Sequence, residues 1–401
     1  MHKLNTLEFK EINQSILKAT LIILFLTIPI SRSLFALCSL IILITWVISN
    51  DWKNYFKYIS NRPTIFISII FPIWMFISIN WSEGSEKTIL DAIKVNWQLF
   101  LIPIIASLVN STKLIKSCWH SFAAGMIILL IHIYSSKFIN IPWANSQDPS
   151  RIFYNPIPQS IGLSIFCAWC LLYLIDHKPI KLKFIYLILF CFASYAIFEI
   201  SQQRLGYISW LISCSTVLLF TLNKKQRILS LVLFFSIFIS LLFLNDKINN
   251  RFLQAKSDIS SYDFKNNYTS VGARIHMWYT SILIIKKAPW IGHGMGSYPE
   301  LSKESFNDPI MCEIGCKHPH NQYIFYWFEF GFIGLILFAS ILIVALKEFI
   351  IHKNSKVMSI ALLMVLILSS LADSTLWYRG FLYLFVPLLG LCLGELTKEK
   401  Q

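Results

Sequence analysis

The chain contains a succession of apolar runs, each about as long as a helix that crosses a lipid bilayer. A bilayer core of about 30 Å needs roughly 20 apolar residues in a helix. About twelve runs approach this length, and polar segments separate them: Ser15–Pro29, Ser33–Ser49, Thr64–Asn80, Ile89–Val109, Leu114–Tyr134, Gln159–Ile175, Leu182–Ile200, Leu205–Leu222, Ile228–Asn245, Asn321–Leu346, Lys356–Leu371 and Phe381–Leu396. The sequence therefore predicts an all-α polytopic membrane protein with about twelve transmembrane helices.

The composition excludes other classes of protein. Charged residues make up 14% of the 401 residues and hydrophobic residues 56%, whereas soluble domains carry about 25% charge. A soluble globular enzyme is thus excluded, and 32 Phe, 16 Tyr and 13 Trp exclude a disordered chain. The net charge of +14 raises the question of nucleic acid. Its distribution among the loops points to membrane topology instead, so we expect membrane lipids and no nucleic acid as partners.

Loop charge predicts the orientation in the membrane. Basic residues concentrate in one alternating set of connections, which contains both termini together with Asp51–Arg62, Asn110–Lys113, Asp176–Lys181, Asn223–Arg227 and Lys347–Ser355. Because cytoplasmic loops carry an excess of Lys and Arg, both termini are predicted to be cytoplasmic. The first run has no small-residue cleavage site, which favours a signal anchor over a removable signal peptide.

One long segment, Asp246–Pro319, is too polar to span and falls on the outer side. It divides the chain into a bundle of about nine spans at 1–245, an outer loop domain at 246–319 and three spans within 320–401. Apolar residues recur at helical spacing inside this loop, at Ile275, Trp278, Ile282 and Ile285. The pattern predicts an amphipathic helix that rests on the membrane or on the bundle.

Two cysteines lie four residues apart in the same outer loop, Cys312 and Cys316. An oxidising compartment outside the membrane would pair them. We expect such a disulfide to shape the loop, not to take part in chemistry.

Several motifs that would indicate bound cofactors are missing from the sequence. It contains no GxxxxGK[ST] phosphate loop and no Asp-x-Asp pair that could cradle Mg²⁺ with a nucleotide sugar. No set of His, Cys and Glu has the spacing of a zinc site. We therefore expect no metal and no cofactor, and both ATP-driven transport and metal-dependent nucleotide-sugar transfer lose support.

Two arginines at the outer boundary are candidates for binding an anion. Arg204 follows Gln203 between two spans, where it could equally be an arginine that reaches toward lipid headgroups. Arg274 stands near the start of the predicted loop helix. A cation there is more stable if an anion joins it, because exposed amides at a helix start bind phosphate. A solvated surface arginine is the alternative for Arg274.

The place where the long loop returns to the membrane gathers polar residues. His318, His320 and Asn321 lie at the start of an apolar run, and Glu329 lies about two turns deeper. A lone interfacial histidine is usually a tolerated polar residue. Four polar groups at one position favour function, and histidine can act as a general base near neutral pH.

Two other outer features are interpreted as structural. Gly292, Gly294 and Gly296 follow the loop helix without a strand before them, so we expect close backbone packing against the bundle or a ligand, not a dinucleotide site. Asp373 and Arg379 lie in the last outer loop, and we expect them to form a structural salt bridge.

At these residues the sequence resembles the O-antigen ligase family, which belongs to a wider group with O-antigen polymerases. The likeness rests on the order and spacing of short motifs: Gln203–Arg204, Gly272–Arg274, Pro289 with Gly292, Gly294 and Gly296, and His320–Asn321 followed by Gly331 and Gly334. The resemblance implies a glycosyltransferase-C-like membrane fold with one large periplasmic loop before the last three spans. It also implies a location in the bacterial inner membrane.

The resemblance further implies a reaction at the periplasmic face. An O-antigen linked to undecaprenyl diphosphate would be the donor and the lipid A–core oligosaccharide the acceptor, in a metal-independent, inverting transfer. Arg204 and Arg274 would grip the diphosphate, and His320 would take the proton of the acceptor hydroxyl. Supporting roles would fall to the polar neighbours, namely Gln203, His318, Asn321, Glu329, Asp373 and Arg379.

Two alternatives stay open from the sequence. An O-antigen polymerase would use the same donor with a second lipid-linked glycan as acceptor, and acceptor choice depends on loop shape. A lipid-glycan flippase or other transporter would show paired repeats and charges lining a midplane cavity, which the sequence lacks. A purely structural role would leave Arg204, Arg274 and His320 unexplained.

Overall fold

The computed structural model describes residues 2–48, 62–109, 111–141, 152, 155–176, 179–261, 269–303, 312, 315–351 and 356–396. Secondary structure in these parts of the chain is helical, with no strand. Eight described helices are long and apolar enough to cross a membrane: Pro63–Trp81, Glu86–Leu108, Thr112–Ser135, Pro156–Ile175, Ile180–Ser201, Arg204–Thr221, Gln322–Ile351 and Arg379–Leu396. Two shorter apolar helices, Arg32–Ile48 and Val357–Ala372, accompany them. The predicted all-α polytopic class is confirmed.

Each of the predicted spans falls on a helix. Eight coincide with the helices long enough to cross, and two coincide with the shorter apolar helices. The remaining two, Ser15–Pro29 and Ile228–Asn245, overlap helix α1 (His2–Thr27) and helix α11 (Lys224–Leu244). About twelve crossings therefore stays a prediction, since length and composition together support eight of the described helices.

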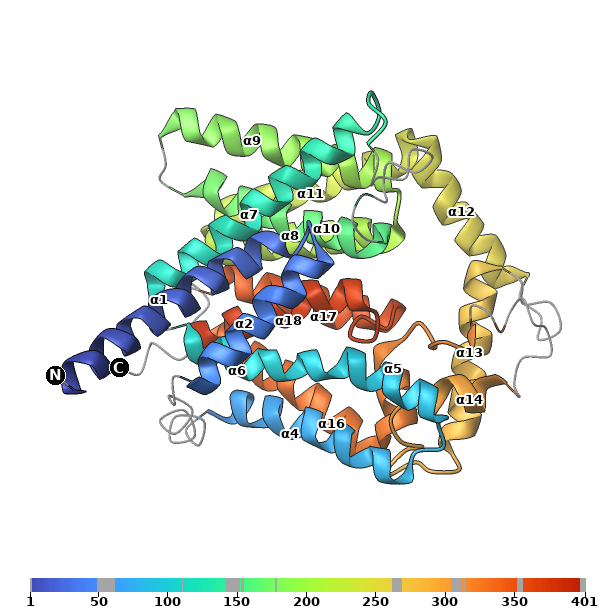
Figure 1. Cartoon of the computed structure of the whole chain (residues 1–401). Helices are drawn as coiled ribbons and strands as arrows, with labels where there is room; N and C mark the ends of the chain where they lie inside the picture. The colour runs from blue at the N-terminus through green and yellow to red at the C-terminus, as the bar shows by residue number, and fades with distance from the viewer. Residues whose placement is uncertain are drawn as a thin grey trace.

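Most of the helices run side by side as a bundle (Figure 1). Helix α8 packs against α9 and α10, α10 against α17, α18 against α6, and α16 against α4. The bounds of these helices are Pro63–Ile77 for α4, Leu101–Leu108 for α6, Pro156–Ile175 for α8, Ile180–Tyr195 for α9, Arg204–Thr221 for α10, Gln322–Ile351 for α16, Val357–Ala372 for α17 and Arg379–Leu396 for α18. Both chain ends lie at one end of this bundle in Figure 1.

Burial separates the centre of the bundle from its edge. In the apolar stretch of α18, 89% of the residues are buried, against 28% for the helix that begins with α9. Helix α9 accordingly exposes large apolar side chains such as Phe184 and Phe192, as a helix does when it faces lipid. The central helices α17 and α18 therefore provide the rigid frame on which the last outer loop is built.

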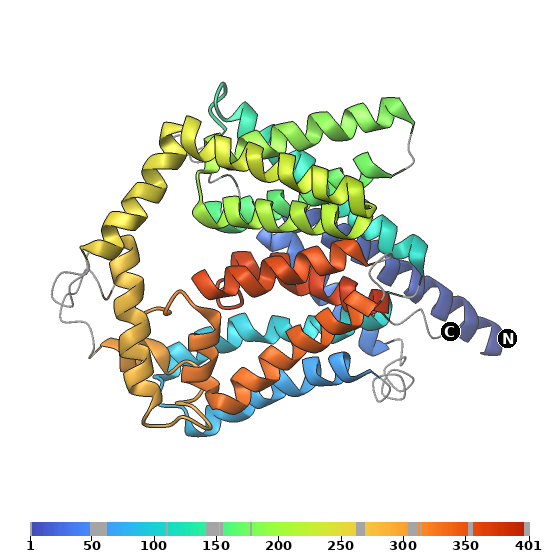
Figure 2. The same cartoon turned by 180° about the vertical axis from the view of Figure 1, so that it is seen from behind.

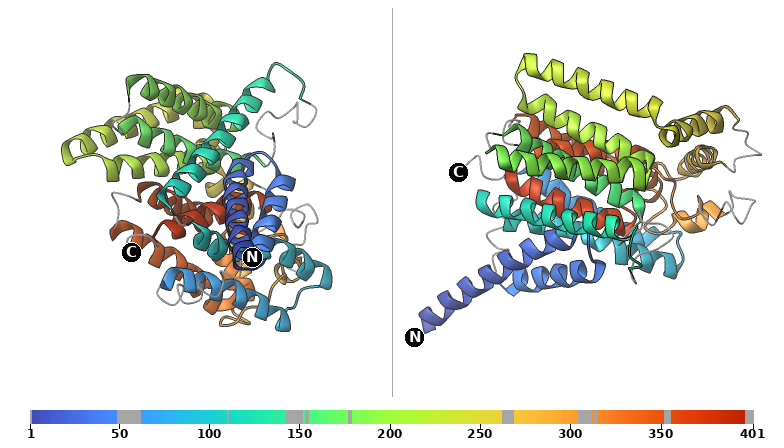
Figure 3. Two further views of the ribbon diagram at one scale, coloured as in Figure 1. Left: turned by 60° about the vertical axis from the view of Figure 1, so that its left-hand side comes forward. Right: turned by 90° about the horizontal axis from the view of Figure 1, so that it is seen from above.

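The segment predicted as an outer loop closes the opposite end of the bundle. It contains α12 (Asp246–Ser260), α13 (Ser270–Ile285) and α14 (Tyr298–Lys303). Figure 2 shows α12 and α13 running across the end of the bundle, and Figure 3 shows the same arrangement from above. The predicted amphipathic helix is α13: it packs on α16 and α14, buries Ile285 and exposes Ile282.

The glycine-rich turn after α13 docks on a break in α16. Gly331 has φ +68°, which interrupts the regular backbone of α16. The freed groups bind the turn, because the Gly294 N–H donates to the Glu329 carbonyl at 2.8 Å and the Phe332 N–H donates to the Pro289 carbonyl at 2.9 Å. A Cβ on Gly331 would lie 2.2 Å from the Trp290 carbonyl oxygen. Close packing against the bundle is thus the role of these glycines.

Candidate functional site

His320 and Asp373 meet where α16 begins and α17 ends. Nδ1 of His320 lies 3.1 Å from Oδ1 of Asp373, and the Ser374 N–H donates to the same oxygen at 2.8 Å. Asp373 is buried, with 3% of its surface exposed, whereas His320 is partly exposed. An imidazole held on one nitrogen by a buried carboxylate presents its other nitrogen outward, which is the arrangement of a general base.

Side-chain hydrogen bonds join the start of α16 to the loop after α17. Oδ1 of Asn321 accepts from the N–H groups of Tyr323 and Ile324 and so caps α16, while its Nδ2 donates to the Leu371 carbonyl at 3.0 Å. Oε1 of Gln322 accepts from the Leu376 N–H at 2.6 Å. These bonds fix the two segments that carry His320 and Asp373 relative to each other.

His318 is a neutral neighbour of this pair. Its ring centroid lies 4.1 Å from that of His320 and 4.3 Å from that of Trp377. The pKa of His318 is lowered to about 3, chiefly by burial and also by the electrostatic effects of His320 and Arg274. Its Nδ1 accepts the His320 backbone N–H at 3.3 Å, so that atom carries no proton. The 4.0 Å approach of this nitrogen to Asp373 is therefore not an ion pair.

Asp373 binds His320 and not its expected partner. Burial alone would raise the pKa of the Asp373 carboxyl, but the hydrogen bond from His320 and the electrostatic effects of His320 and Arg274 hold it below its usual value. The predicted salt bridge between Asp373 and Arg379 is wrong. Arg379 starts α18 with an exposed side chain and acts electrostatically on Asp91.

Helix α13 brings Arg274 to the histidines. Thr269 caps the helix by accepting the Gly272 N–H at 3.0 Å, and Arg274 follows in the next turn. The charge of Arg274 acts electrostatically on both His318 and Asp373. One turn further along, the Trp278 indole donates to the Pro319 carbonyl at 2.8 Å. The cation and the loop that carries His320 are thus linked through one helix.

Arg204 begins a different helix at the same end of the bundle. A π-helical turn, Ala196–Ser201, ends at Gln202, whose φ of +51° reverses the backbone direction before α10 starts at Arg204. Nε2 of Gln203 donates to the Ser201 carbonyl and stabilises this reversal. Helix α10 packs on α17, the helix that leads to Asp373. Arg204 itself is half-buried.

Glu329 faces the glycine-rich turn. Its Oε1 accepts from the N–H groups of Gly296 and Tyr298, at 3.1 and 3.4 Å, and the side chain is 1% exposed. These bonds attach the turn to α16. The structure thus gives Glu329 a part in holding the loop, away from the hydrogen bonds of His320.

A disulfide joins Cys312 and Cys316 just before the histidines. Cys316 packs against Ala273 and Met277 of α13, and the Ser302 hydroxyl donates to the Cys316 carbonyl. This contact holds the segment that leads to His318 against α13.

The same cluster contains donors that a metal ion could use. One ligand atom each of His318, His320 and Asp373 lies within 4.8 Å of the others, and three protein ligands are the usual number at a catalytic zinc. The hydrogen bonds compete with this use, because Nδ1 of His318 accepts the His320 N–H and Nδ1 of His320 binds Asp373. The arrangement therefore favours a proton-transfer site over a metal site.

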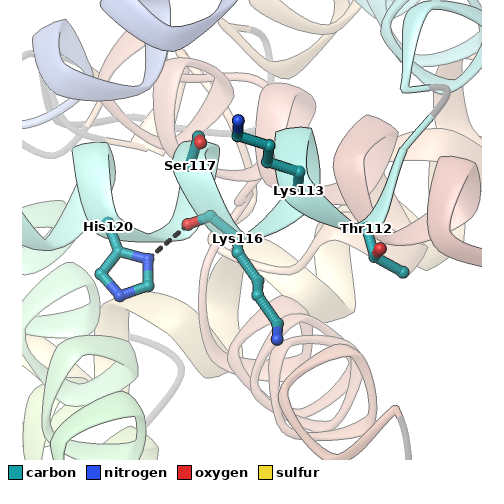
Figure 4. A pocket seen from close by; sticks show the side chains of 5 residues that line it. All are labelled: Thr112, Lys113, Lys116, Ser117 and His120. Carbon is teal, nitrogen blue, oxygen red and sulfur yellow. Dashed lines mark hydrogen bonds between the residues drawn. The ribbon is translucent and has the colours of Figure 1, made fainter.

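A cavity of about 540 Å³ lies at the other end of the bundle, on helix α7 (Thr112–Ser135) (Figure 4). All of its lining residues come from this one helix: Thr112, Lys113, Lys116, Ser117 and His120. Nδ1 of His120 binds the Lys116 carbonyl of its own helix at 2.6 Å. The lining contains no acid and no residue of a second helix, so it lacks the convergence of groups seen around His320.

Comparison with known proteins finds a matching family model for the middle part of the chain. Residues 187–339 match the family model described as O-Antigen ligase. The match covers somewhat over a third of the chain, and this stretch is similar to the O-antigen ligase family. This stretch contains Arg204, Arg274 and His320, and the predicted resemblance is confirmed.

Two curated relatives agree with this assignment. An O-antigen ligase of Escherichia coli is 27% identical over 240 residues, which cover 58% of this chain and 55% of that protein. An uncharacterised protein of Haemophilus influenzae is 34% identical over 137 residues, which cover 33% of this chain and 34% of that protein. The matched segments thus span about half and about a third of these relatives.

Sequence reasoning missed two contacts at this candidate site. Asp373 was assigned to Arg379, six residues away, and not to His320, which lies 53 residues away. Trp278 was recognised only as one apolar position of an amphipathic helix, although its indole N–H binds next to His320. A signal for Asp373 existed, because a carboxylate directly after an apolar span needs a partner.

Proposed function

We propose that this protein is an O-antigen ligase, which transfers an O-antigen from undecaprenyl diphosphate to the lipid A–core oligosaccharide. The match of residues 187–339 to the O-antigen ligase family model, and the similarity to an O-antigen ligase of Escherichia coli, support glycosyl transfer in general. The observation that carries the proposal is the His320–Asp373 pair with Arg274 beside it, at the end of the bundle that lies opposite both termini.

His320 would act as the general base. With Nδ1–H donated to Asp373, the lone pair of Nε2 is available to the acceptor hydroxyl. As the acceptor oxygen attacks the anomeric carbon, its proton passes to Nε2 and the new glycosidic bond forms. Asp373 would stabilise the imidazolium that results, as a buried carboxylate does beside the histidine base of a catalytic triad.

The bond that breaks joins the anomeric carbon to the diphosphate oxygen, and negative charge grows on that leaving group. Arg274 and Arg204 would neutralise this charge through forked hydrogen bonds to the phosphate oxygens. Donors that are fixed before the reaction stabilise such charge with little reorganisation. Two arginines would thereby do the work that Mg²⁺ does in nucleotide-sugar enzymes, and the proposed reaction is metal-independent.

The proposed location follows from loop charge. The basic connections predict that both termini face the cytoplasm. Helices α12 and α13 lie at the opposite end of the bundle, and Trp278 of α13 contacts Pro319, the residue before His320. His320 would then face the periplasm, at the surface of the inner membrane, where lipid-linked donor and lipid A–core acceptor can both reach it.

Deletion of the gene, followed by gel analysis of lipopolysaccharide, tests the function. A ligase predicts complete core without attached O-antigen, together with accumulation of the lipid-linked polymer. Core that carries a single repeat would instead identify an O-antigen polymerase. Normal lipopolysaccharide in the deletion strain would refute both.

A further inference from the structure

Trp278 makes a polar contact at the residue next to the proposed base. Its indole N–H donates to the Pro319 carbonyl at 2.8 Å, and Pro319 directly precedes His320. Trp278 stands four residues after Arg274 on α13, so the two side chains share one face of the helix. The same helix α13 thus carries Arg274, the proposed ligand of the diphosphate, and Trp278, which donates a hydrogen bond to the loop that carries His320.

The peptide unit between Pro319 and His320 is held at both of its ends. Its oxygen accepts from Trp278, and its N–H donates to Nδ1 of His318 at 3.3 Å. A peptide unit is planar, so fixing the oxygen and the hydrogen fixes the orientation of the whole plane. That plane, together with the pairing of His320 with Asp373, determines the direction in which the imidazole points.

The backbone of His320 needs such a constraint. Its φ of +50° lies in the left-handed region, which is costly for a residue with a side chain. Residues keep such conformations only where their surroundings determine them, and they concentrate at functional sites. Gln202, just before Arg204, is the other non-glycine residue with positive φ in the described chain.

Trp278 is itself anchored. It packs against a small cluster formed by Ala273, Met277 and Cys316, to which the disulfide partner Cys312 also belongs. Its position is therefore fixed by the helix and by the disulfide, independently of the Pro319 contact.

We propose that Trp278 is a positioning residue for His320, which holds the left-handed backbone of the base at a set place relative to Arg274. This inference rests on the proposed function, because it assigns His320 the role of base. Arg274 would hold the donor diphosphate and Trp278 would hold the base, both from α13. The distance between the anomeric carbon and Nε2 then depends on one rigid helix.

The test removes the indole N–H and keeps an aromatic ring, in Trp278→Phe. Trp327→Phe is the matched control, because its indole N–H also donates to a proline carbonyl, that of Pro289, at 3.0 Å. Both variants are purified as full chains and assayed for transfer from a lipid-linked glycan to lipid A–core. A misplacement of about 1 Å can cost about 100-fold in rate. We expect Trp278→Phe to lose between ~10- and ~100-fold in kcat with the donor KM within about twofold of wild type.

A second measurement uses the other end of the peptide unit. His318→Phe removes the acceptor of the His320 N–H. Combined with Trp278→Phe it completes a double-mutant cycle, in which kcat is compared among wild type, the two single variants and the double variant. If both residues hold one plane, the loss of kcat in the double variant is smaller than the product of the single losses.

Equal kcat for Trp278→Phe and Trp327→Phe, or multiplicative losses in the cycle, would overturn the inference. His320→Ala separates this failure from that of the proposed function. An inactive His320→Ala together with a fully active Trp278→Phe refutes the positioning role alone. A fully active His320→Ala refutes the base itself.

Discussion

Asp373→Asn tests the proposed role of His320 as base, because the substitution keeps the shape of the Asp373 side chain and removes its negative charge. Oδ1 of Asp373 receives both His320 Nδ1, at 3.1 Å, and the Ser374 N–H, at 2.8 Å. An asparagine oxygen at that position can accept both hydrogen bonds. What disappears is the attraction between the carboxylate and the imidazolium that forms during proton transfer.

The size of this loss can be worked from the geometry. Two unit charges 3.1 Å apart attract by about 5 kcal/mol at an effective dielectric constant of about 20, which is an upper limit. A hydrogen bond to a charged group contributes about 1 kcal/mol more than a hydrogen bond between neutral groups, which gives a lower limit for the loss. A loss of about 2–4 kcal/mol in transition-state stabilisation corresponds to a kcat roughly 30- to 1000-fold lower.

Steady-state transfer measured over a range of donor concentrations provides the assay. We expect kcat to fall and the donor KM to stay within about twofold, since Arg204 and Arg274 are unchanged. Asp258→Asn is the control, because Asp258 is also a buried carboxylate, 5% exposed, on α12 at the same end of the molecule. An Asp373→Asn rate within about threefold of the control, or a loss confined to KM, would refute the reasoning.

Three other predictions concern the metal, the pH and the backbone. EDTA is expected to leave transfer unchanged, and strong inhibition that added Zn²⁺ reverses would instead assign His318, His320 and Asp373 to a metal. The pKa of His318 is about 3 in the folded protein and about 6.5 in the unfolded chain, so between these values the unfolded chain binds more protons. The free energy of unfolding therefore decreases as the pH is lowered below about 6.5. The melting temperature of His318→Gln should fall less than that of wild type between about pH 7.5 and pH 5, and an equal fall would contradict the assignment. Gly331→Ala should destabilise by at least ~2 kcal/mol, because its Cβ meets the Trp290 carbonyl at 2.2 Å. Gly162→Ala is the control, since the only close approach of its Cβ, 2.6 Å, is to the far end of the flexible Met126 side chain. Equal melting temperatures for the two variants would refute the role of the break in α16.

The fold was predictable where the sequence carries a strong local signal. A span needs about 20 apolar residues, so each crossing leaves its own mark, and every predicted run falls on a helix. The outer helix α13 was predictable from the spacing of Ile275 to Ile285 for the same reason. The break in α16 at Gly331 was not, because it depends on hydrogen bonds to Pro289 and Trp290 that form only after the loop docks.

The site was predictable in its components but not in its pairings. His320, Arg274 and His318 were recognisable as polar groups at a membrane boundary, and the structure brings these three together. The partner of Asp373 was assigned by closeness in sequence, which favoured Arg379. The order in which α16 and α17 pack places His320 nearer, and no local pattern encodes that packing.

The central claim is that His320 takes the proton of an acceptor hydroxyl during glycan transfer. The direct measurement is transfer of a lipid-linked glycan to lipid A–core by the purified protein, compared between His320→Ala and His120→Ala. His120 is an exposed histidine on α7 at the other end of the bundle and serves as the control. We predict that His120→Ala forms product at the wild-type rate and that His320→Ala forms about 100-fold less or none, as expected for loss of a general base. Equal product from both variants would contradict the claim.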